Sequence, residues 1–233
     1  MHIPDGFLGP KMSQGLLGAA ASVLGYCFGK VMQAVTAVVP QQVIATAGNT
    51  IGNIQIGGRR VLTKLGEAKL AKMGLVASWI FAAQMFNFPI GGGTSGHLIG
   101  GLFASVLLGP FAGTIVISVV LIIQSLFFAD GGLMALGANI INMAVIGSLG
   151  GYYIYAGLKK SLTDTSSIAI SAWCSVVLAA LACSLEIGFS GTIPLQSVTS
   201  TMLKTHCLIG FVEAIITIVL LRVYANKSVS DEI

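Results

Sequence analysis

The first two residues of the chain, Met1 and His2, can together chelate a metal ion. The Met1 amine and the His2 main-chain nitrogen close a five-membered ring on an ion, and Nδ1 of the His2 imidazole closes a six-membered ring with the same amide nitrogen. A fourth nitrogen would complete a square-planar site, which suits Ni(II) and Cu(II). The amine must be unblocked and the amide deprotonated, so we expect binding to weaken as the pH falls. A Met-His start can also arise by chance.

The fourth nitrogen could come from His97, one of only three histidines in the sequence. It ends a glycine-rich segment, NFPIGGGTSGH, over residues 87–97. Irregular backbone at membrane depth is tolerated where it is buried in protein or lines a cavity, and ionisable residues there are usually functional. The alternative is a histidine satisfied by main-chain carbonyls at a helix start.

Other polar residues could support these ligands. Asp130 lies in an Asp-Gly-Gly turn, and Asn139 and Asn142 follow at an expected helix start. We expect them to brace a folded-in N-terminus or to accept the second N–H of a ligating histidine. His206 and Glu213 are seven residues apart and therefore share one face of a helix. They could support the ligands, line an ion path or simply pack together.

The elements that must position these residues are membrane helices. The chain of 233 residues is 55% hydrophobic and only 9% charged, against about 25% charged in soluble domains. A spanning helix needs about 20 mostly apolar residues. We therefore predict an all-α, polytopic membrane protein of about seven transmembrane helices, near residues 13–38, 68–88, 95–110, 111–129, 132–157, 166–190 and 199–224.

Basic residues predict the orientation of the chain, because cytoplasmic loops are enriched in Lys and Arg. An N-terminus outside and a C-terminus in the cytoplasm leave only Lys11 and Lys204 outside. The inner segments then hold Lys30, Arg59, Arg60, Lys64, Lys69, Lys72, Lys159, Lys160, Arg222 and Lys227. This topology puts Met1 and the segment before His97 on the same side of the cell inner membrane.

We expect one integral membrane domain over 1–233, with a metal-binding N-terminal segment at 1–12, an irregular inner loop at 39–66 and a polar, mobile tail at 226–233. The start does not resemble a signal peptide, and we expect it to be the mature start. The cysteines lie far apart without a CxxC pair, so buried thiols are favoured. No GxxxxGK[ST] motif occurs, so we expect no ATP hydrolysis by a P-loop in this chain. The basic residues form no continuous patch for nucleic acid.

Four stretches resemble a known family: MHIPDGFL at the start, FAAQMFNFPIGGGTSGHLIGG at 81–101, FFADGGLMALGANIINMA at 127–144 and HCLIGFVEAIIT at 206–217. They are similar to the cobalt/nickel substrate-binding (S) component of energy-coupling-factor transporters, the CbiM/NikM-like family. The resemblance spans most of the chain except 37–66 and the middle of the sixth expected helix. The segment between the first two helices is longer than the family pattern leads us to expect.

The resemblance implies an ATP-driven importer whose membrane component captures Co(II) or Ni(II) as transported substrate, with no permanently bound cofactor. It implies a transmembrane coupling (T) subunit, two ATPase subunits and a small accessory membrane protein as partners. It also implies metal ligands at Met1, His2 and His97.

Two other classes of function are open to the same residues. A passive metal channel or a metal-sensing membrane module would use the same ligands without ATPase partners. An intramembrane serine protease could use Ser95, in a GxSG pattern, with His206 as the base. The protease interpretation leaves the Met-His start without a role.

Overall fold

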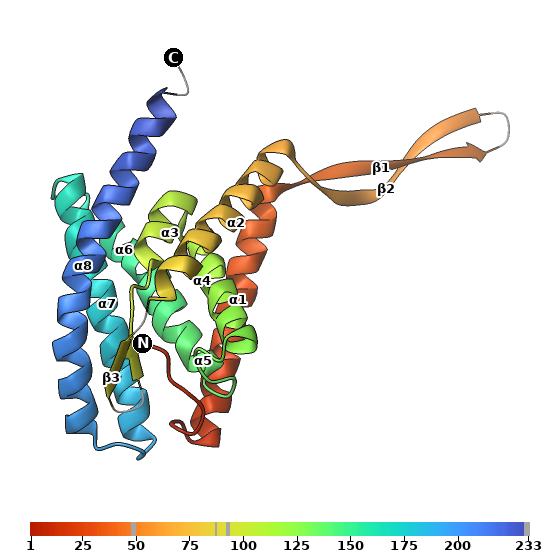
Figure 1. Ribbon diagram of the computed structural model, residues 1–233. Helices are drawn as coiled ribbons and strands as arrows, with labels where there is room; N and C mark the ends of the chain where they lie inside the picture. The colour runs from red at the N-terminus through yellow and green to blue at the C-terminus, as the bar shows by residue number, and fades with distance from the viewer. Residues whose placement is uncertain (48–49, 87, 92–93, 231–233) are drawn as a thin grey trace.

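The computed structural model describes residues 1–47, 50–86, 88–91 and 94–230, of which 40–47, 50–58, 88–91, 94–95 and 226–230 are described by their main chain alone. Figure 1 shows a bundle of helices with a long β-hairpin projecting from one end. The helical elements are α1 (Pro10–Val35), α2 (Lys64–Gln84), α3 (Gly101–Leu108), α4 (Pro110–Phe127), α5 (Leu136–Asn139), the π-helix η1 (Ile140–Gly150), α6 (Gly151–Leu158), α7 (Asp164–Phe189) and α8 (Leu195–Ser230).

The predicted class, a helical multi-span membrane protein, is confirmed. Five helical segments of the described chain are long and apolar enough to cross a membrane: α1, α4, the continuous unit from α5 to α6, α7 and α8 up to Ala225. The count of seven spans and the orientation of the termini stay predictions. α2 has 21 residues, but it carries Glu67, Lys69 and Lys72 within its first turns.

The third expected helix, 95–110, is wrong in part, because only Gly101–Leu108 is helical. The chain before it forms a small antiparallel hairpin of β3 (Phe88–Gly91) and β4 (Thr94–Gly96). Gly100 then adopts a left-handed conformation (φ 71°) as the N-cap of α3, which glycine accepts at little cost. His97 therefore precedes a helix start without being part of the helix.

The prediction of an irregular loop at 39–66 is also wrong, because most of this segment forms a β-hairpin. β1 (Thr36–Ala47) and β2 (Thr50–Leu62) pair antiparallel along their length, with Thr36 opposite Leu62. Thr63 then caps α2, its hydroxyl accepting the N–H of Gly66 at 2.9 Å. At the other end of the chain, α8 continues through Ser230, so the tail expected to be mobile is helical up to that residue, and 231–233 lie outside the described residues.

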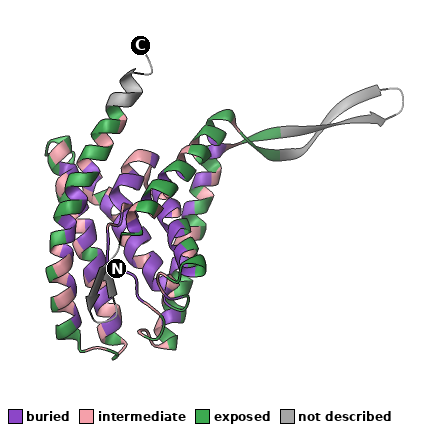
Figure 2. Ribbon diagram, viewed as in Figure 1, coloured by how far each residue is buried: buried purple, intermediate pink, exposed green. Residues whose placement is uncertain are grey.

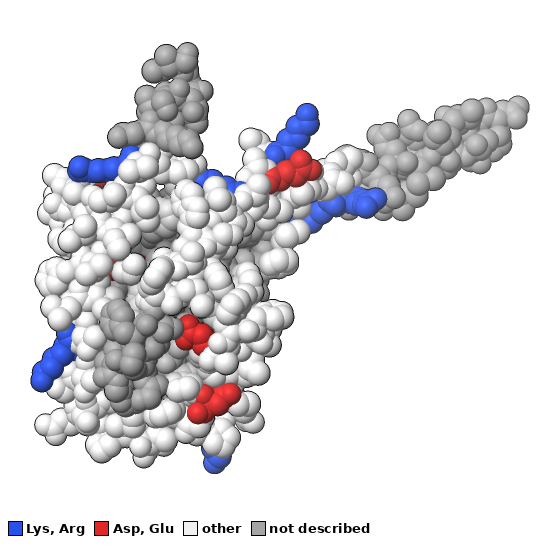
Figure 3. Space-filling view, in the orientation of Figure 1, with Lys and Arg blue, Asp and Glu red and all other residues white. Residues whose placement is uncertain are grey.

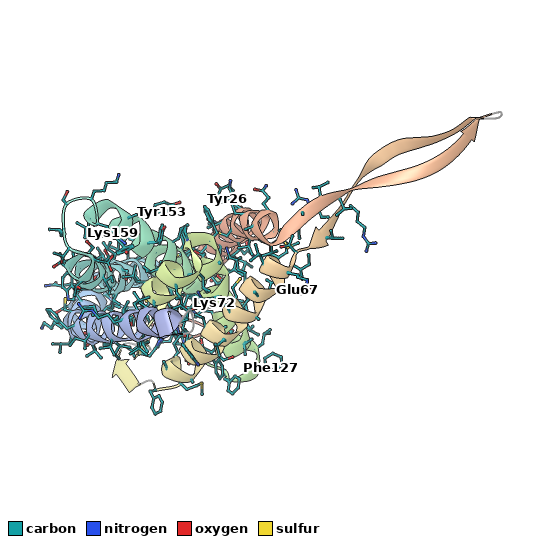
Figure 4. The ribbon with its side chains drawn as sticks, turned by 90° about the horizontal axis from the view of Figure 1, so that it is seen from above. Tyr26, Glu67, Lys72, Phe127, Tyr153 and Lys159 are labelled. Carbon is teal, nitrogen blue, oxygen red and sulfur yellow. The ribbon has the colours of Figure 1, made fainter. Side chains whose placement is uncertain are left out.

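Burial is arranged around the centre of the bundle, where α3, α4, η1 and α7 contribute most of the buried residues. Figure 2 shows this pattern, with exposed residues on the outward faces. Viewed from above, Phe127 and Tyr153 point away from the bundle on opposite sides (Figure 4). Their side chains are apolar or aromatic and exposed, which fits a surface that faces lipid.

Charged residues gather at the ends of the bundle. Figure 3 shows most of the visible Lys and Arg at the end from which the β1–β2 hairpin projects. The white middle of this face carries few charges, as a bilayer requires. The N-terminal segment enters the bundle from the end opposite the hairpin (Figure 1).

Candidate metal centre

The N-terminal segment does not trail in solvent but enters the bundle. Met1 and Ile3 are fully buried and His2 is 3% exposed. Asn139 holds the main chain of Ile3: its Oδ1 accepts the Ile3 N–H at 2.8 Å and its Nδ2 donates to the Ile3 carbonyl at 3.1 Å. The Gly132 N–H donates to the same carbonyl at 2.9 Å. These bonds fix the depth at which the amine lies.

A second clamp acts at Asp5, where the chain leaves the bundle. Its carboxylate accepts the main-chain N–H groups of Leu133 and Met134, the latter at 2.7 Å. Gly6 follows in a left-handed conformation (φ 90°) and turns the chain toward α1. The loop between α4 and α5 is thus the surface on which the N-terminal segment docks.

The two imidazoles expected to bind metal lie together. The ring centroids of His2 and His97 are 4.6 Å apart, and both side chains are almost fully buried. His2 Nδ1 lies 2.7 Å from Asp130 Oδ1, and His97 Nδ1 lies 2.7 Å from the carbonyl oxygen of Leu98. In both rings Nε2 is buried without a hydrogen-bond partner. Each imidazole is therefore oriented through Nδ1, as ligating histidines commonly are.

The contact of His2 with Asp130 differs from the chelate expected from the sequence. In that chelate Nδ1 binds the ion, whereas here Nδ1 faces a carboxylate. Ala129 and Gly131, which flank Asp130, both have positive φ values, 53° and 90°. An alanine in this region is uncommon and costs conformational energy, so the loop is held in an unusual path that points Asp130 at His2.

Burial keeps the nitrogen donors neutral. It lowers the pKa of the Met1 amine from 8.0 to about 5, although Cys183 and Asp130 act in the opposite direction. Burial likewise lowers the pKa of His2, against the hydrogen bond that its Nδ1 makes with the Asp130 carboxylate, which raises it. The pKa of His97 falls well below its usual value, first by burial and then through the charge of the Met1 amine. Near neutral pH, amine and imidazoles therefore present lone pairs, which a metal ion requires.

The segment that carries His97 is anchored by side chains from other helices. Glu213 on α8 accepts the Ile99 N–H at 2.9 Å with one oxygen and the Gly100 N–H at 2.7 Å with the other. Gln84 on α2 donates to the Ile99 carbonyl at 2.6 Å. Gln124 on α4 supports it in turn by donating to the Gln84 carbonyl oxygen at 3.0 Å. Helices distant in sequence thus fix the main chain two residues after His97.

The remaining residues named from the sequence take other positions. Asn142 does not bond the N-terminal segment; its Nδ2 donates to Glu186 at 2.7 Å. His206 is fully buried, and its Nδ1 bonds the carbonyl oxygen of Met202. The Ser95 side chain lies outside the described side chains, so the serine–histidine pair of a protease has no described geometry.

Sequence reasoning missed Gln84, Gln124 and Glu186. The signal available was their polarity within long apolar stretches, where an amide or carboxyl group must find an internal partner. In the described part of the chain, no three His, Cys, Asp or Glu side chains form a group that could hold a metal ion.

Apolar helices around a buried set of neutral nitrogens define a multi-span membrane protein with an internal, nitrogen-rich site. Residues 35–229 match the family described as "Cobalt uptake substrate-specific transmembrane region". The chain belongs to this family, which confirms the resemblance seen in its motifs.

Individual proteins similar to this chain carry related names. A putative fused nickel transport protein of Archaeoglobus fulgidus is 36% identical over 219 residues, which cover 93% of this chain and 63% of that protein. A putative metal transport protein of Haloquadratum walsbyi is 36% identical over 219 residues, covering 93% of this chain and 86% of that protein. A crystal structure described as a transition metal transporter matches 99% of this chain and 94% of its own, with 30% identity and a TM-score of 0.78. The chain thus spans less than two thirds of the fused relative.

Proposed function

We propose that this chain is the substrate-binding membrane component of an importer for Co(II) or Ni(II). The observation that carries the proposal is the burial of the Met1 amine beside the paired rings of His2 and His97. A charged amine would be costly in this buried position, whereas a neutral amine is a metal ligand. The names of the relatives, nickel and metal transport proteins, support the same class of substrate.

The proposed ligands are the Met1 amine, the His2 main-chain nitrogen, His2 Nδ1 and His97 Nε2. Binding turns the His2 ring about its Cβ–Cγ bond, which releases Nδ1 from Asp130 and brings Nε2 to the side of that carboxylate. Deprotonation of the amide lowers the net charge of the bound dication, which eases its burial in a low dielectric. The arrangement suits planar Ni(II), and Cu(II) would bind still more tightly.

Transport would be driven by partners. The resemblance to the energy-coupling-factor family supports a transmembrane coupling subunit, two ATPase subunits and a small accessory membrane protein, in the inner membrane. Glu213, Gln84 and Gln124 would keep His97 in place until the component moves against its partners. ATP-dependent uptake that requires the ATPase subunits would separate this function from a passive channel or a sensor.

The site itself is tested by extending the chain. Two alanines placed before Met1 move the amine by two residues and convert the Met1 nitrogen into an amide, while every side chain stays. A single alanine is avoided, because Ala-Met-His would itself offer Ni(II) an amine, two main-chain nitrogens and an imidazole. We expect calorimetry with Ni(II) to show near-complete loss of binding. The matched control adds two alanines after Ile233, at the far end of the chain, and should bind like the native protein. Unchanged affinity in the N-terminally extended protein would falsify the terminal chelate.

A further inference from the structure

A cavity lies between α1, α2 and the turn that joins α3 to α4. It has a volume of about 130 Å³, and its wall carries two lysines, Lys30 on α1 and Lys69 on α2. The other residues of the wall are glycine, proline and residues with apolar side chains. With two cationic side chains and no acidic residue in its wall, the cavity is suited to an anion.

The two lysines have no counter-charge in the described part of the chain. Neither Lys30 nor Lys69 belongs to an ion pair there. Lys30 lies over the ring of Tyr26, 5.5 Å from its centroid. Lys72, one turn after Lys69 on α2, is engaged elsewhere and donates to the Leu107 carbonyl at 3.5 Å. Like charges at the edge of one cavity repel each other, more strongly as the surroundings become less polar, and an anion between them offsets this repulsion.

The cavity lies at the boundary between the membrane and water. The apolar span of α1 ends at Val35 and that of α4 begins at Pro110, so the cavity borders the end of one span and the start of another. Lys30 is five residues before Val35, ~7.5 Å along the helix. The headgroup layer is ~5–8 Å thick on each side of the hydrocarbon core. A lysine at this depth extends its charged end into that layer.

An aromatic surface continues from the cavity toward the middle of the bilayer. Tyr26 lies one turn deeper than Lys30 on α1 and is 58% exposed. Its ring packs edge to face against Phe111, a residue of the cavity wall, with 5.6 Å between the ring centroids. A cationic pocket in the headgroup layer with an apolar surface below it matches an amphiphile that has an anionic head. A free anion would use the pocket alone.

We propose that this cavity binds the phosphate headgroup of an anionic phospholipid. Lys30 and Lys69 contact the phosphate oxygens, and an acyl chain lies along Tyr26 and Phe111. The volume agrees, because about 130 Å³ corresponds to roughly four water-sized units of ~30 Å³, enough for a phosphate group with its four oxygens. The site is separate from the proposed metal centre: it lies at the end of α1 from which the β1–β2 hairpin projects, whereas the N-terminal segment enters from the opposite end (Figure 1).

A site of this kind selects lipids by the charge of the head. Phosphatidylglycerol should bind in preference to phosphatidylcholine, whose choline cation offsets the phosphate charge. Replacing both lysines, Lys30→Gln with Lys69→Gln, should weaken the binding of phosphatidylglycerol by at least about ten-fold, because each lysine supplies a charge-assisted hydrogen bond. Lys30→Arg with Lys69→Arg should retain binding, since a guanidinium group also binds phosphate.

The experiment uses the purified full chain in a neutral detergent. Native mass spectrometry measures the apparent dissociation constant of the first bound phosphatidylglycerol, with phosphatidylcholine as the competing lipid and inorganic phosphate as a further competitor. The matched control is Lys64→Gln with Lys160→Gln, which removes two positive charges from exposed residues outside the cavity wall. Far-ultraviolet circular dichroism checks the helical fold of each variant. Lys69→Gln alone is measured in parallel in case the double variant fails to fold.

Weaker binding of phosphatidylglycerol in the folded glutamine variants, with native binding in the arginine variant and in the control, supports the proposal. Native binding in the glutamine variants overturns it. An equal loss in the control also overturns it, because the total charge would then decide binding. Equal affinity for phosphatidylcholine shows that the charge of the head is not recognised, and displacement of the lipid by inorganic phosphate assigns the cavity to a free anion; either result rejects the lipid site.

Discussion

Asn139 grips the main chain of Ile3 with both ends of its amide, accepting the Ile3 N–H at 2.8 Å and donating to the Ile3 carbonyl at 3.1 Å. Asn139 is the last residue of α5, where the π-helix η1 begins. π-Helical turns are rare and frequently mark functional sites. A rigid helical element thus sets the position of a residue two places away from the Met1 amine.

Asn139→Asp should release the N-terminal segment. The aspartate presents a second oxygen to the Ile3 carbonyl, so one hydrogen bond becomes a repulsion in a buried place. We expect Ni(II) affinity to fall by roughly ten-fold to a hundred-fold, from the ~1–3 kcal/mol cost of an unpaired buried group. Calorimetry measures the loss. In the protein with two added N-terminal alanines the same substitution should cause little further loss, because coupled effects are not additive.

A methyl group at Gly132 should also release the N-terminal segment, in this case by a steric clash. A Cβ there would collide with the main chain and carboxylate of Asp5. Gly132→Ala should therefore lower Ni(II) affinity while the helical far-ultraviolet spectrum is retained. Gly18→Ala is the control, because a Cβ at this helical position meets nothing within 4 Å. Equal binding by both variants would show that the Asp5 clamp is dispensable.

Asp130→Asn tests the charge beside His2. The amide oxygen can still accept a hydrogen bond, but it loses the negative charge that makes an imidazole a stronger ligand. Such changes next to a ligating histidine typically cost about 10–100-fold in metal affinity. The control is Asp164→Asn, at the first residue of α7, which should leave the Ni(II) affinity unchanged. A native titration curve for Asp130→Asn would exclude a role for its charge.

Much of the candidate site could be predicted from the sequence, because its main features are short or continuous stretches of the chain. The Met-His pair is contiguous, and the apolar runs that carry the other residues are long enough to identify a membrane bundle. His97 lies beside His2 as expected. The orientation of the His2 ring does not follow, because it depends on Asp130, 128 residues away.

Elements set by long-range contacts were less predictable. The anchoring of Ile99 and Gly100 joins α3 to α8 and α2 through single hydrogen bonds, and no sequence spacing encodes these pairs. The β1–β2 hairpin contains a register shift between Gln41 and Gln42, which interrupts the alternation that identifies a strand. For residues 40–47 and 50–58 of this hairpin only the main chain is described, and it shows the antiparallel pairing of the two strands.

Docking of the N-terminal segment in the metal-free protein should depend on pH. The pKa of the Met1 amine is about 5 when docked and 8.0 in the open chain, chiefly through burial. The undocked state therefore binds more protons between these values, so docking is strongest above pH 8 and weakens as the pH falls toward 5, by at most ~4 kcal/mol. Hydrogen exchange of the Ile3 amide, corrected for intrinsic rate, measures this. A flat profile from pH 8 to 5 would contradict the buried, neutral amine.

Glu213→Gln should displace His97 without touching it. The carboxylate accepts two main-chain N–H groups, whereas a glutamine has one oxygen and must turn its NH₂ toward the other N–H. A buried donor then faces a donor, a cost of about 1–3 kcal/mol, and the chain at 99–100 shifts. We expect Ni(II) to retain the three N-terminal nitrogens but to lose the fourth, so the planar spectrum changes and affinity falls by roughly ten-fold.

The matched control for Glu213→Gln is Glu186→Gln. Glu186 is another membrane-embedded carboxyl group, and one of its oxygens accepts a single bond from Asn142 at 2.7 Å. A glutamine oxygen can still accept that bond, so spectrum and affinity should remain native. If both variants lose affinity to the same degree, loss of a membrane-embedded carboxyl group is the cause and the anchoring of His97 is not. If only Glu213→Gln alters the spectrum, the two hydrogen bonds at 99–100 are what hold the fourth nitrogen in the plane of the ion.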